Sequence, residues 1–88
     1  MKEIYIRKMK YDEARYKLER EIHDAFMAGE KEVDIVHGIG EGILKKMVAE
    51  FVQQNDFLQL NESFLYTNPG ATRVEITGPD KQLLKKYL

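Results

Sequence analysis

The segment from His37 to Leu44, with the sequence HGIGEGIL, constrains the fold more than any other part of the chain. It joins a β-branched run, Val33 to Val36, to a stretch with apolar residues at helical spacing. Its three glycines, at alternate positions, form a turn without Cβ atoms, so another molecule can approach the backbone closely. The amide groups that open the following helix favour an anion such as phosphate. The sequence therefore predicts a strand, a glycine turn and a helix, with a ligand contact at the turn.

Apolar patterns elsewhere in the chain predict the remaining secondary structure. Residues 4–7 alternate apolar and polar side chains, which is typical of a half-buried strand. The other expected elements are a helix over 11–28 with Gly29 as its C-cap, a strand over 31–36, a helix over 41–54, strands over 57–66 and 72–76, and a short helix over 79–88. Strands joined through a helix should be parallel with a right-handed crossover, whereas Asn68-Pro69-Gly70 predicts a hairpin turn. The order β-α-β-α-β-β predicts a two-layer α/β (α+β) sandwich, with two helices on one face of a four-stranded mixed sheet.

The length and composition indicate one globular domain. The chain has 88 residues, 43% of them apolar and 33% charged, and no segment approaches the ~20 apolar residues of a membrane span. The chain contains no cysteine, which excludes disulfides, thiolate metal sites and a cysteine nucleophile. We expect residues 1–78 to form the domain and residues 79–88 to pack on it or extend from it. A domain of this size buries only about 60–65% of its unfolded surface, which is compatible with a homo-oligomer or a larger parent chain.

Charge is nearly balanced, so any binding of nucleic acid must depend on local clusters of cations. The formal net charge is −1, whereas nucleic-acid-binding domains usually carry a basic excess. Arg7 and Lys8 lie at the end of the first expected strand, and Lys45 and Lys46 lie about one turn into the second expected helix. The carboxyl ends of parallel neighbouring strands meet at one sheet edge, where ligands of open α/β sheets bind. Arg7 and Lys8 should therefore lie close to His37 and the glycine turn.

Several of these residues have two interpretations. His37 could contact a ligand or transfer a proton, or it could be a structural hydrogen-bonding residue at a strand end. The glycines could cradle a phosphate or could serve only the tight turn. Glu41, expected in the first turn of the helix, opposes phosphate binding there and could simply complement the helix dipole. Lys45 and Lys46 could bind a backbone phosphate or could form a solvated face.

A further pair points outward from the sheet face that the helices are not expected to cover. Tyr5 and Arg73 could stack on a nucleic-acid base at that face. The other interpretation is ordinary cross-strand pairing, for example of Arg73 with Glu62 or Glu75. Both interpretations remain open from the sequence.

The run from Val33 to Val48 and the later run from Gly70 to Ile76 resemble the small MutS-related (Smr) domain family. That family's marks are a His-Gly-x-Gly-x-Gly-x-Leu turn and a late Gly-x-Thr-x-Val strand, and the chain carries both. The similarity extends from Ile4 to Ile76. It implies a fold like the C-terminal domain of a bacterial translation initiation factor, and binding to DNA or RNA.

Some members of that family cut nucleic acid, and the resemblance ties this activity mainly to a Leu-Asp-x-His motif on the first strand. In this chain the motif falls on residues 4–7, where Tyr5 replaces the aspartate and Arg7 replaces the histidine. Neither replacement titrates near neutral pH, so neither is a general base, and the carboxylate that Mg²⁺ would prefer is missing. In addition, Ile39 stands where many members have a basic residue. We therefore expect a nucleic-acid-binding scaffold without the intact nuclease motif.

Three functions follow as hypotheses. The first is a module that binds DNA or RNA through residues near the glycine turn: Arg7, Lys8, His37, Gly38, Gly40, Gly42, Lys45 and Lys46. The second is an endonuclease for branched or structured DNA or RNA, with His37 as the catalytic proton-transfer group. The third is a protein-interaction module. We expect a cytoplasmic protein without a membrane partner, a metal site or a cofactor, and Mg²⁺ or Mn²⁺ only if the nuclease is active. The G-x-G-x-G spacing and the short chain do not match a dinucleotide-binding domain.

Overall fold

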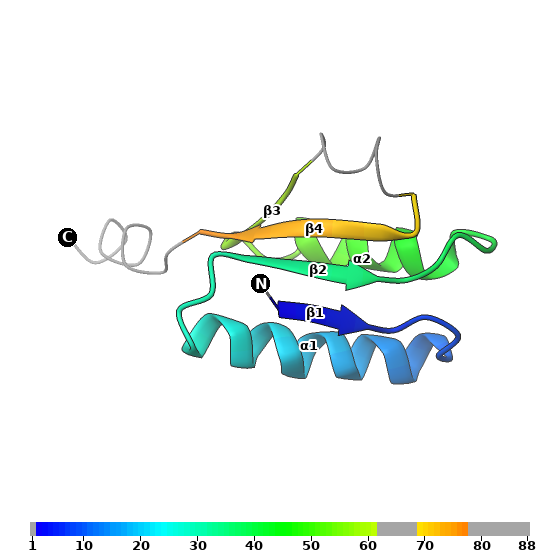
Figure 1. The fold of residues 1–88 in the computed structure, drawn as a ribbon, viewed down its shortest axis with the longest axis horizontal. Helices are drawn as coiled ribbons and strands as arrows, with labels where there is room; N and C mark the ends of the chain where they lie inside the picture. Colours follow the sequence, from blue (N-terminus) through cyan, green and yellow to red (C-terminus); the bar gives the residue numbers. More distant parts are fainter. Residues whose placement is uncertain (1, 62–68, 78–88) are drawn as a thin grey trace.

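The computed structural model describes residues 2–61 and 69–77, which form a single mixed sheet and two helices (Figure 1). The elements in chain order are β1 (Lys2–Tyr5), α1 (Tyr11–Met27), β2 (Glu32–Val36), α2 (Ile43–Gln53), β3 (Leu58–Leu60) and β4 (Ala71–Ile76). The sheet order is β1-β2-β4-β3, with β1 parallel to β2 and β4 antiparallel to both of its neighbours. This architecture confirms the predicted fold class. The short helix expected over residues 79–88 lies outside the described residues.

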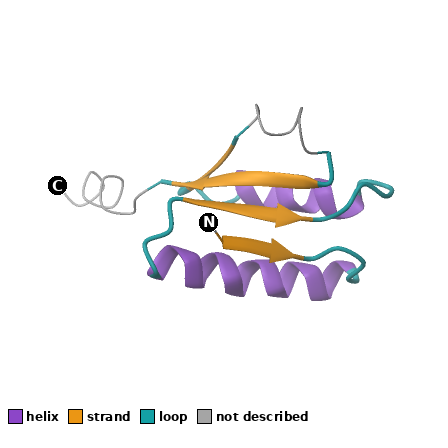
Figure 2. Ribbon diagram, viewed as in Figure 1, coloured by secondary structure: helices purple, strands orange, loops and turns teal. Residues whose placement is uncertain are grey.

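The two helices pack against each other and share one core with the sheet (Figure 2). Side chains alternate between the two faces of a strand, and the inward set of β2 is Val33 and Ile35, both fully buried. Val74 and Ile76 of β4 continue this apolar layer. Each such aliphatic side chain stabilises the fold by roughly 1.5–3 kcal/mol relative to leaving it in water. The core therefore lies between the sheet and the helices, and neither α1 nor α2 covers the opposite sheet face.

Helix α1 ends at Met27, one residue before the predicted end. Its last turn closes with Gly29 at a φ of +78°, just beyond the C-cap residue Ala28. The Gly29 amide donates to the Phe26 carbonyl at 3.2 Å, and the Glu30 amide donates to the Ala25 carbonyl at 2.9 Å. This pair of bonds is a Schellman motif, in which glycine accepts the left-handed conformation without steric cost.

Three predicted boundaries were wrong by a few residues. Helix α2 begins at Ile43 and not at residue 41, because Gly40 and Gly42 have positive φ values of +22° and +81° and extend the turn. Glu41 consequently lies outside the helix, and its predicted place in the first turn was wrong. Strand β1 ends at Tyr5, because Arg7 and Lys8 form a turn. Strand β3 spans only residues 58–60, and residues 62–68 of the predicted strand lie outside the described part.

Arg73 pairs with an aspartate that the sequence analysis did not name. It lies directly opposite Asp34 in the antiparallel register of β2 and β4, and its Nε and its NH2 group donate to the two oxygens of that carboxylate at 2.8 and 3.1 Å. A carboxylate of Glu32 lies 3.9 Å away. The interpretation as cross-strand pairing is therefore confirmed, while Glu75 was the wrong partner and Glu62 lies outside the described residues.

Among residues 2–61 and 69–77, neither helix is apolar and long enough to cross a bilayer.

Candidate nucleic-acid interface

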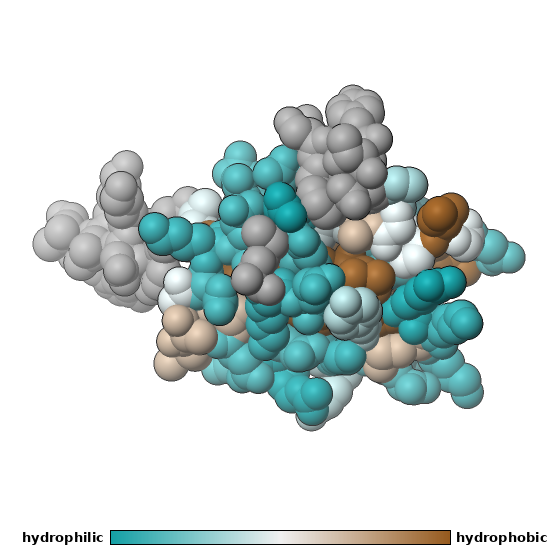
Figure 3. All heavy atoms as spheres, in the orientation of Figure 1, coloured by the Kyte–Doolittle hydropathy of each residue, from teal (hydrophilic) through white to brown (hydrophobic). Residues whose placement is uncertain are grey.

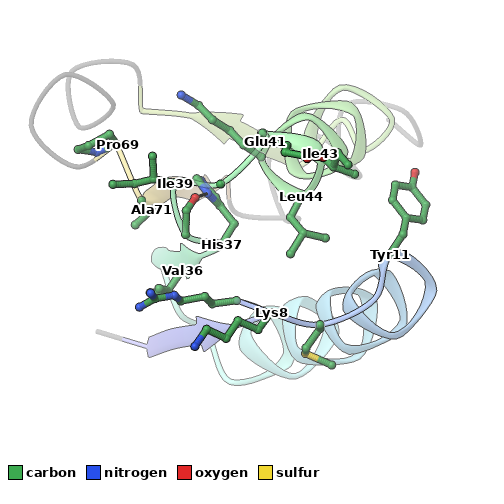
Figure 4. A pocket seen from close by; sticks show the side chains of 17 residues that line it. Lys8, Tyr11, Val36, His37, Ile39, Glu41, Ile43, Leu44, Pro69 and Ala71 are labelled. Carbon is green, nitrogen blue, oxygen red and sulfur yellow. Dashed lines mark hydrogen bonds between the residues drawn. The ribbon is translucent and has the colours of Figure 1, made fainter.

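A groove of about 900 Å³ opens at the edge of the sheet where β1 and β2 end (Figure 4). Four segments form its walls: the loop between β1 and α1, the glycine turn, the first turn of α2, and the start of β4. Of the eight residues predicted to bind nucleic acid, seven line this groove: Arg7, Lys8, His37, Gly38, Gly40, Gly42 and Lys45. Lys46 does not, because successive helix residues point about 100° apart. The parallel pairing of β1 and β2 thus brings two distant parts of the sequence together.

The side chain of Arg7 lies directly over Gly38. A Cβ atom placed on Gly38 would come within 3.1 Å of Arg7 Cγ and 3.5 Å of Cδ. Gly38 also has a φ of +81°, which side-chain-bearing residues rarely adopt. The glycine is therefore required twice, for its backbone conformation and for the close approach of Arg7. This packing fixes the arginine stem and leaves its exposed head group at the groove.

Lys8 reaches the groove through a strained turn. Its φ is +66°, and it alone among the described non-glycine residues has a positive φ. The turn closes through the Met9 amide, which donates to the Ile6 carbonyl at 3.1 Å. A left-handed conformation costs a residue with a Cβ atom about 1–2 kcal/mol, and such strain clusters at functional sites. Among residues 2–61 and 69–77, no ion pair includes Arg7, Lys8 or Lys45.

His37 is buried beneath this cationic surface, with 5% of its area exposed. Its Nδ1 lies 2.8 Å from the Gly38 carbonyl oxygen, and its Nε2 lies 2.8 Å from the hydroxyl oxygen of Thr72. Because a carbonyl can only accept, Nδ1 carries the proton in the neutral ring, and Nε2 accepts from the hydroxyl. Burial lowers the pKa of His37 below its usual value of 6.5; the Gly38 hydrogen bond opposes this effect and the charge of Lys45 adds to it.

This arrangement supports the structural interpretation of His37. Both ring nitrogens are engaged, and the ring is neutral at pH 7 because its pKa is lowered. Proton transfer to a substrate would first require one of these hydrogen bonds to break. His37 therefore joins the glycine turn to β4 through Thr72, and its catalytic role stays a prediction.

The start of β4 holds the turn from the other side. The Gly70 carbonyl accepts two backbone bonds, from the amide of His37 at 3.0 Å and from the amide of Gly38 at 2.9 Å. From the sequence, Gly70 was interpreted as part of a hairpin turn and as the first residue of the family's late strand motif. Its role in anchoring the glycine turn was missed because the antiparallel contact of β4 with β2 is not a neighbouring pair along the chain.

The amino end of α2 also faces the groove. Gly42 is its N-cap, and no side chain of the described residues caps the helix by a hydrogen bond. The first backbone hydrogen bond of the helix runs from the Lys46 amide to the Gly42 carbonyl at 2.9 Å. The preceding amides of the first turn have no partner inside a helix, and they carry the positive end of its dipole. With Glu41 outside the helix, no acidic residue occupies that first turn.

The sequence did not reveal the apolar residues that border this groove. Tyr11, the first residue of α1, lines it together with Met9 and Leu44. Ile39 and Ile43 also line it and are 71% and 56% exposed. The available signal was the position of Tyr11, which directly follows the basic turn after β1.

The first-strand position of the expected nuclease motif has an unrelated contact in this chain. The hydroxyl of Tyr5 donates to a carboxylate oxygen of Glu3 at 3.0 Å, and this hydrogen bond raises the pKa of Tyr5. Within the described ranges, no group of three or more His, Cys, Asp or Glu side chains is placed to hold a metal ion. The expectation that the chain needs no metal stays a prediction.

Known proteins share both the sequence pattern and the fold. The model of the Smr domain matches residues 4–77. Endonuclease MutS2 from Geobacillus sp. (strain WCH70) is 39% identical over 74 residues, which is 84% of this chain and 9% of that protein. The protein of the same name from Halothermothrix orenii is 40% identical over 50 residues, which is 57% of this chain and 6% of that protein.

A solved structure gives an independent comparison. The crystal structure of the Smr domain of Thermus thermophilus MutS2 matches with a TM-score of 0.72 at 20% sequence identity. The match covers 86% of this chain and 98% of that one. The match therefore spans less than a tenth of these two MutS2 relatives but nearly all of the solved Smr domain from Thermus thermophilus. From the extent of the family match together with this shared fold, the chain belongs to the Smr domain family.

Proposed function

We propose that this domain binds DNA or RNA through the groove at the carboxyl ends of β1 and β2. The observation that carries the proposal is the convergence of Arg7, Lys8 and Lys45 on one groove, without an ion-pair partner among the described residues. Cations that line one groove without an ion-pair partner can neutralise phosphates and release the counterions that surround those phosphates. The amino end of α2 adds a further favourable position for phosphate.

Membership of the Smr family supports this proposal. The relatives from Geobacillus and Halothermothrix are named endonucleases, and an endonuclease must contact nucleic acid. In this chain the glycine turn is intact, and its geometry brings the arginine at the end of the first-strand motif to the same groove. The proposed binding therefore depends on cations that the chain carries and not on a basic residue at position 39.

The test is a salt-dependent binding measurement with a matched charge control. Fluorescence anisotropy would follow single-stranded, duplex and branched DNA and RNA at several salt concentrations. We expect Arg7→Ala with Lys45→Ala to weaken binding about 10–100-fold and to lower the salt slope by about 2. The control removes the same charge at two exposed positions that do not line the groove, Arg20→Ala with Lys31→Ala.

The outcomes separate nucleic-acid binding from a protein-interaction module. Equal losses in the two double variants would contradict the assigned site. The absence of any binding by the native sequence would contradict the function and favour a protein-interaction module. Binding that only the groove variant weakens supports the proposal.

A second candidate function is endonuclease activity, which the names of the two relatives favour. Here Tyr5 is hydrogen-bonded to Glu3, and both nitrogens of His37 have partners. We therefore expect no nicking of supercoiled plasmid or cleavage of RNA with added Mg²⁺ or Mn²⁺. Nicking that His37→Ala abolishes, in a variant that still folds, would overturn this expectation and assign a catalytic role to the histidine.

A further inference from the structure

We propose that the groove accommodates an unpaired nucleotide, with its base against apolar side chains and its phosphate on Arg7 and Lys8. The domain would then select single-stranded segments, such as loops and gaps, over continuous duplex. This inference rests on the proposed function, because it concerns the same groove and names the part of the nucleic acid that enters it.

Exposed apolar side chains are concentrated at this groove. Six large hydrophobic residues in the described part of the chain are exposed, and three of them, Tyr11, Ile39 and Ile43, line the groove. Tyr11 is 42% exposed. In Figure 3, hydrophobic side chains likewise reach the surface at the end of the molecule where the loop between β2 and α2 lies. Large apolar groups at a cationic site favour a ligand that is both charged and apolar, as a nucleotide is.

The apolar residues surround the space from several sides (Figure 4). Leu44 points from α2 into the space, toward the loop that carries Lys8. Tyr11 stands at one end, and Ile39 stands at the other. The volume of about 900 Å³ lies within the roughly 300–1,000 Å³ typical of small-molecule pockets. The groove is therefore large enough for a base together with its sugar.

Charge fixes the direction in which the nucleotide would lie. Glu41 borders the groove on the side opposite Lys8, where its charge offsets the attraction of Lys45 and the amino end of α2 for phosphate (Figure 4). Arg7 follows Ile6 on the same loop as Lys8, so the two cations present one phosphate-binding side. The base would then point toward Leu44 and Tyr11.

A continuous duplex cannot use these apolar side chains. Its bases are stacked on one another and paired, and its backbone presents only phosphate and sugar, for which the cations alone suffice. An unpaired base exposes both faces, which stack on aromatic side chains in a way that tolerates any sequence. The apolar border of the groove therefore contributes to binding only when a nucleotide is unpaired.

The experiment compares two probes of equal length and charge, a fully paired duplex and a duplex in which several central base pairs are replaced by mismatches that form an internal single-stranded loop. Both are prepared as DNA and as RNA and measured by anisotropy at one salt concentration. We expect the native sequence to prefer the mismatched probe by about ten-fold, and Ile39→Ser or Tyr11→Ala to reduce this ratio toward one. Tyr11→Phe should retain the ratio, since its ring still stacks. Tyr16→Ala is the matched control, because Tyr16 is exposed on the same helix but does not line the groove.

Each result decides something different. Binding of both probes with equal affinity, still dependent on Arg7, would overturn this inference and leave the proposed function standing. No binding of either probe would contradict both. A ratio that Ile39→Ser preserves would also overturn the inference, and because Ile39 is 71% exposed, that variant is expected to fold.

Discussion

The uncovered face of the sheet and the groove at its edge each carry arginine, but only the groove leaves arginine available to a ligand. On the sheet face, Arg73 is held by two hydrogen bonds to Asp34, with Glu32 nearby. At the groove, Arg7 packs its stem on Gly38 and has no ion-pair partner among the described residues. Strand register places Arg73 opposite Asp34, whereas it gives Arg7 no such partner in the described part of the chain. Register therefore decides which of the two arginines can bind phosphate.

The same contrast explains how a chain with a net charge of −1 can offer a phosphate site. The strand positions opposite the core carry Glu3, Glu32, Asp34 and Glu75, and the sheet face turned to the viewer in Figure 3 is mostly hydrophilic. Phosphate is repelled by this acidic face and attracted to the groove. Overall charge is therefore a poor guide to binding in a domain whose charges are separated by face.

The largest expected effect is a reversal of charge at the groove. Arg7→Glu should weaken nucleic-acid binding about 100-fold, because it removes one attraction and adds one repulsion. Arg73→Gln, on the other face, should leave affinity unchanged, since the native guanidinium is already committed to Asp34. Anisotropy titrations of both variants would measure this, and equal losses would identify the sheet face as part of the interface.

The next effect concerns the buried support of the groove. His37→Ala should lower the free energy of unfolding by about 2–3 kcal/mol, because it leaves a cavity and removes the partners of Thr72 and the Gly38 carbonyl. His23 is exposed on α1, so His23→Ala should change stability by less than about 0.5 kcal/mol. Urea unfolding would compare the two, and similar costs would refute the structural role of His37.

Two glycines separate backbone strain from side-chain contact. Gly38 and Gly42 both have a φ of +81°, but only a Cβ atom on Gly38 would contact Arg7. Each alanine substitution should cost about 1–2 kcal/mol from the left-handed conformation. We expect Gly38→Ala to weaken nucleic-acid binding as well, through the displaced arginine. If Gly42→Ala weakened binding equally, the contact between Arg7 and Gly38 would be irrelevant.

Local patterns predicted the elements of this fold but not their fine boundaries or cross-strand partners. The helix expected over 11–28 is present, and its apolar residues at helical spacing, Ala14, Leu18, Ile22 and Ala25, are buried, because helical periodicity is set by neighbours in sequence. The predicted start of α2 was wrong by two residues. The turn depends on the φ values of its glycines, and glycine can adopt positive or negative φ values, so the sequence does not specify them.

Long-range geometry accounts for the other gaps. Asp34 and Arg73 are 39 residues apart, and a shift of register would give Arg73 another partner, so no local pattern identifies the pair. The approach of Arg7 to the glycine turn followed correctly from the parallel pairing of two strands. The apolar border of the groove required the three-dimensional positions of Tyr11 and Ile43.

The smallest expected effect is a dependence of stability on pH that comes from the groove and not from the sheet face. The folded-state pKa of His37 lies below its unfolded value of 6.5, so between these two values the unfolded chain binds more protons. Stability is therefore complete above 6.5 and falls as the pH decreases toward and through the folded-state pKa. Urea unfolding of the native sequence and of His37→Gln across this range would isolate the contribution, because the carboxylates are common to both. An identical pH slope in the two proteins would show that folding does not lower the pKa of His37, which would contradict a buried neutral ring that donates to Gly38 and accepts from Thr72.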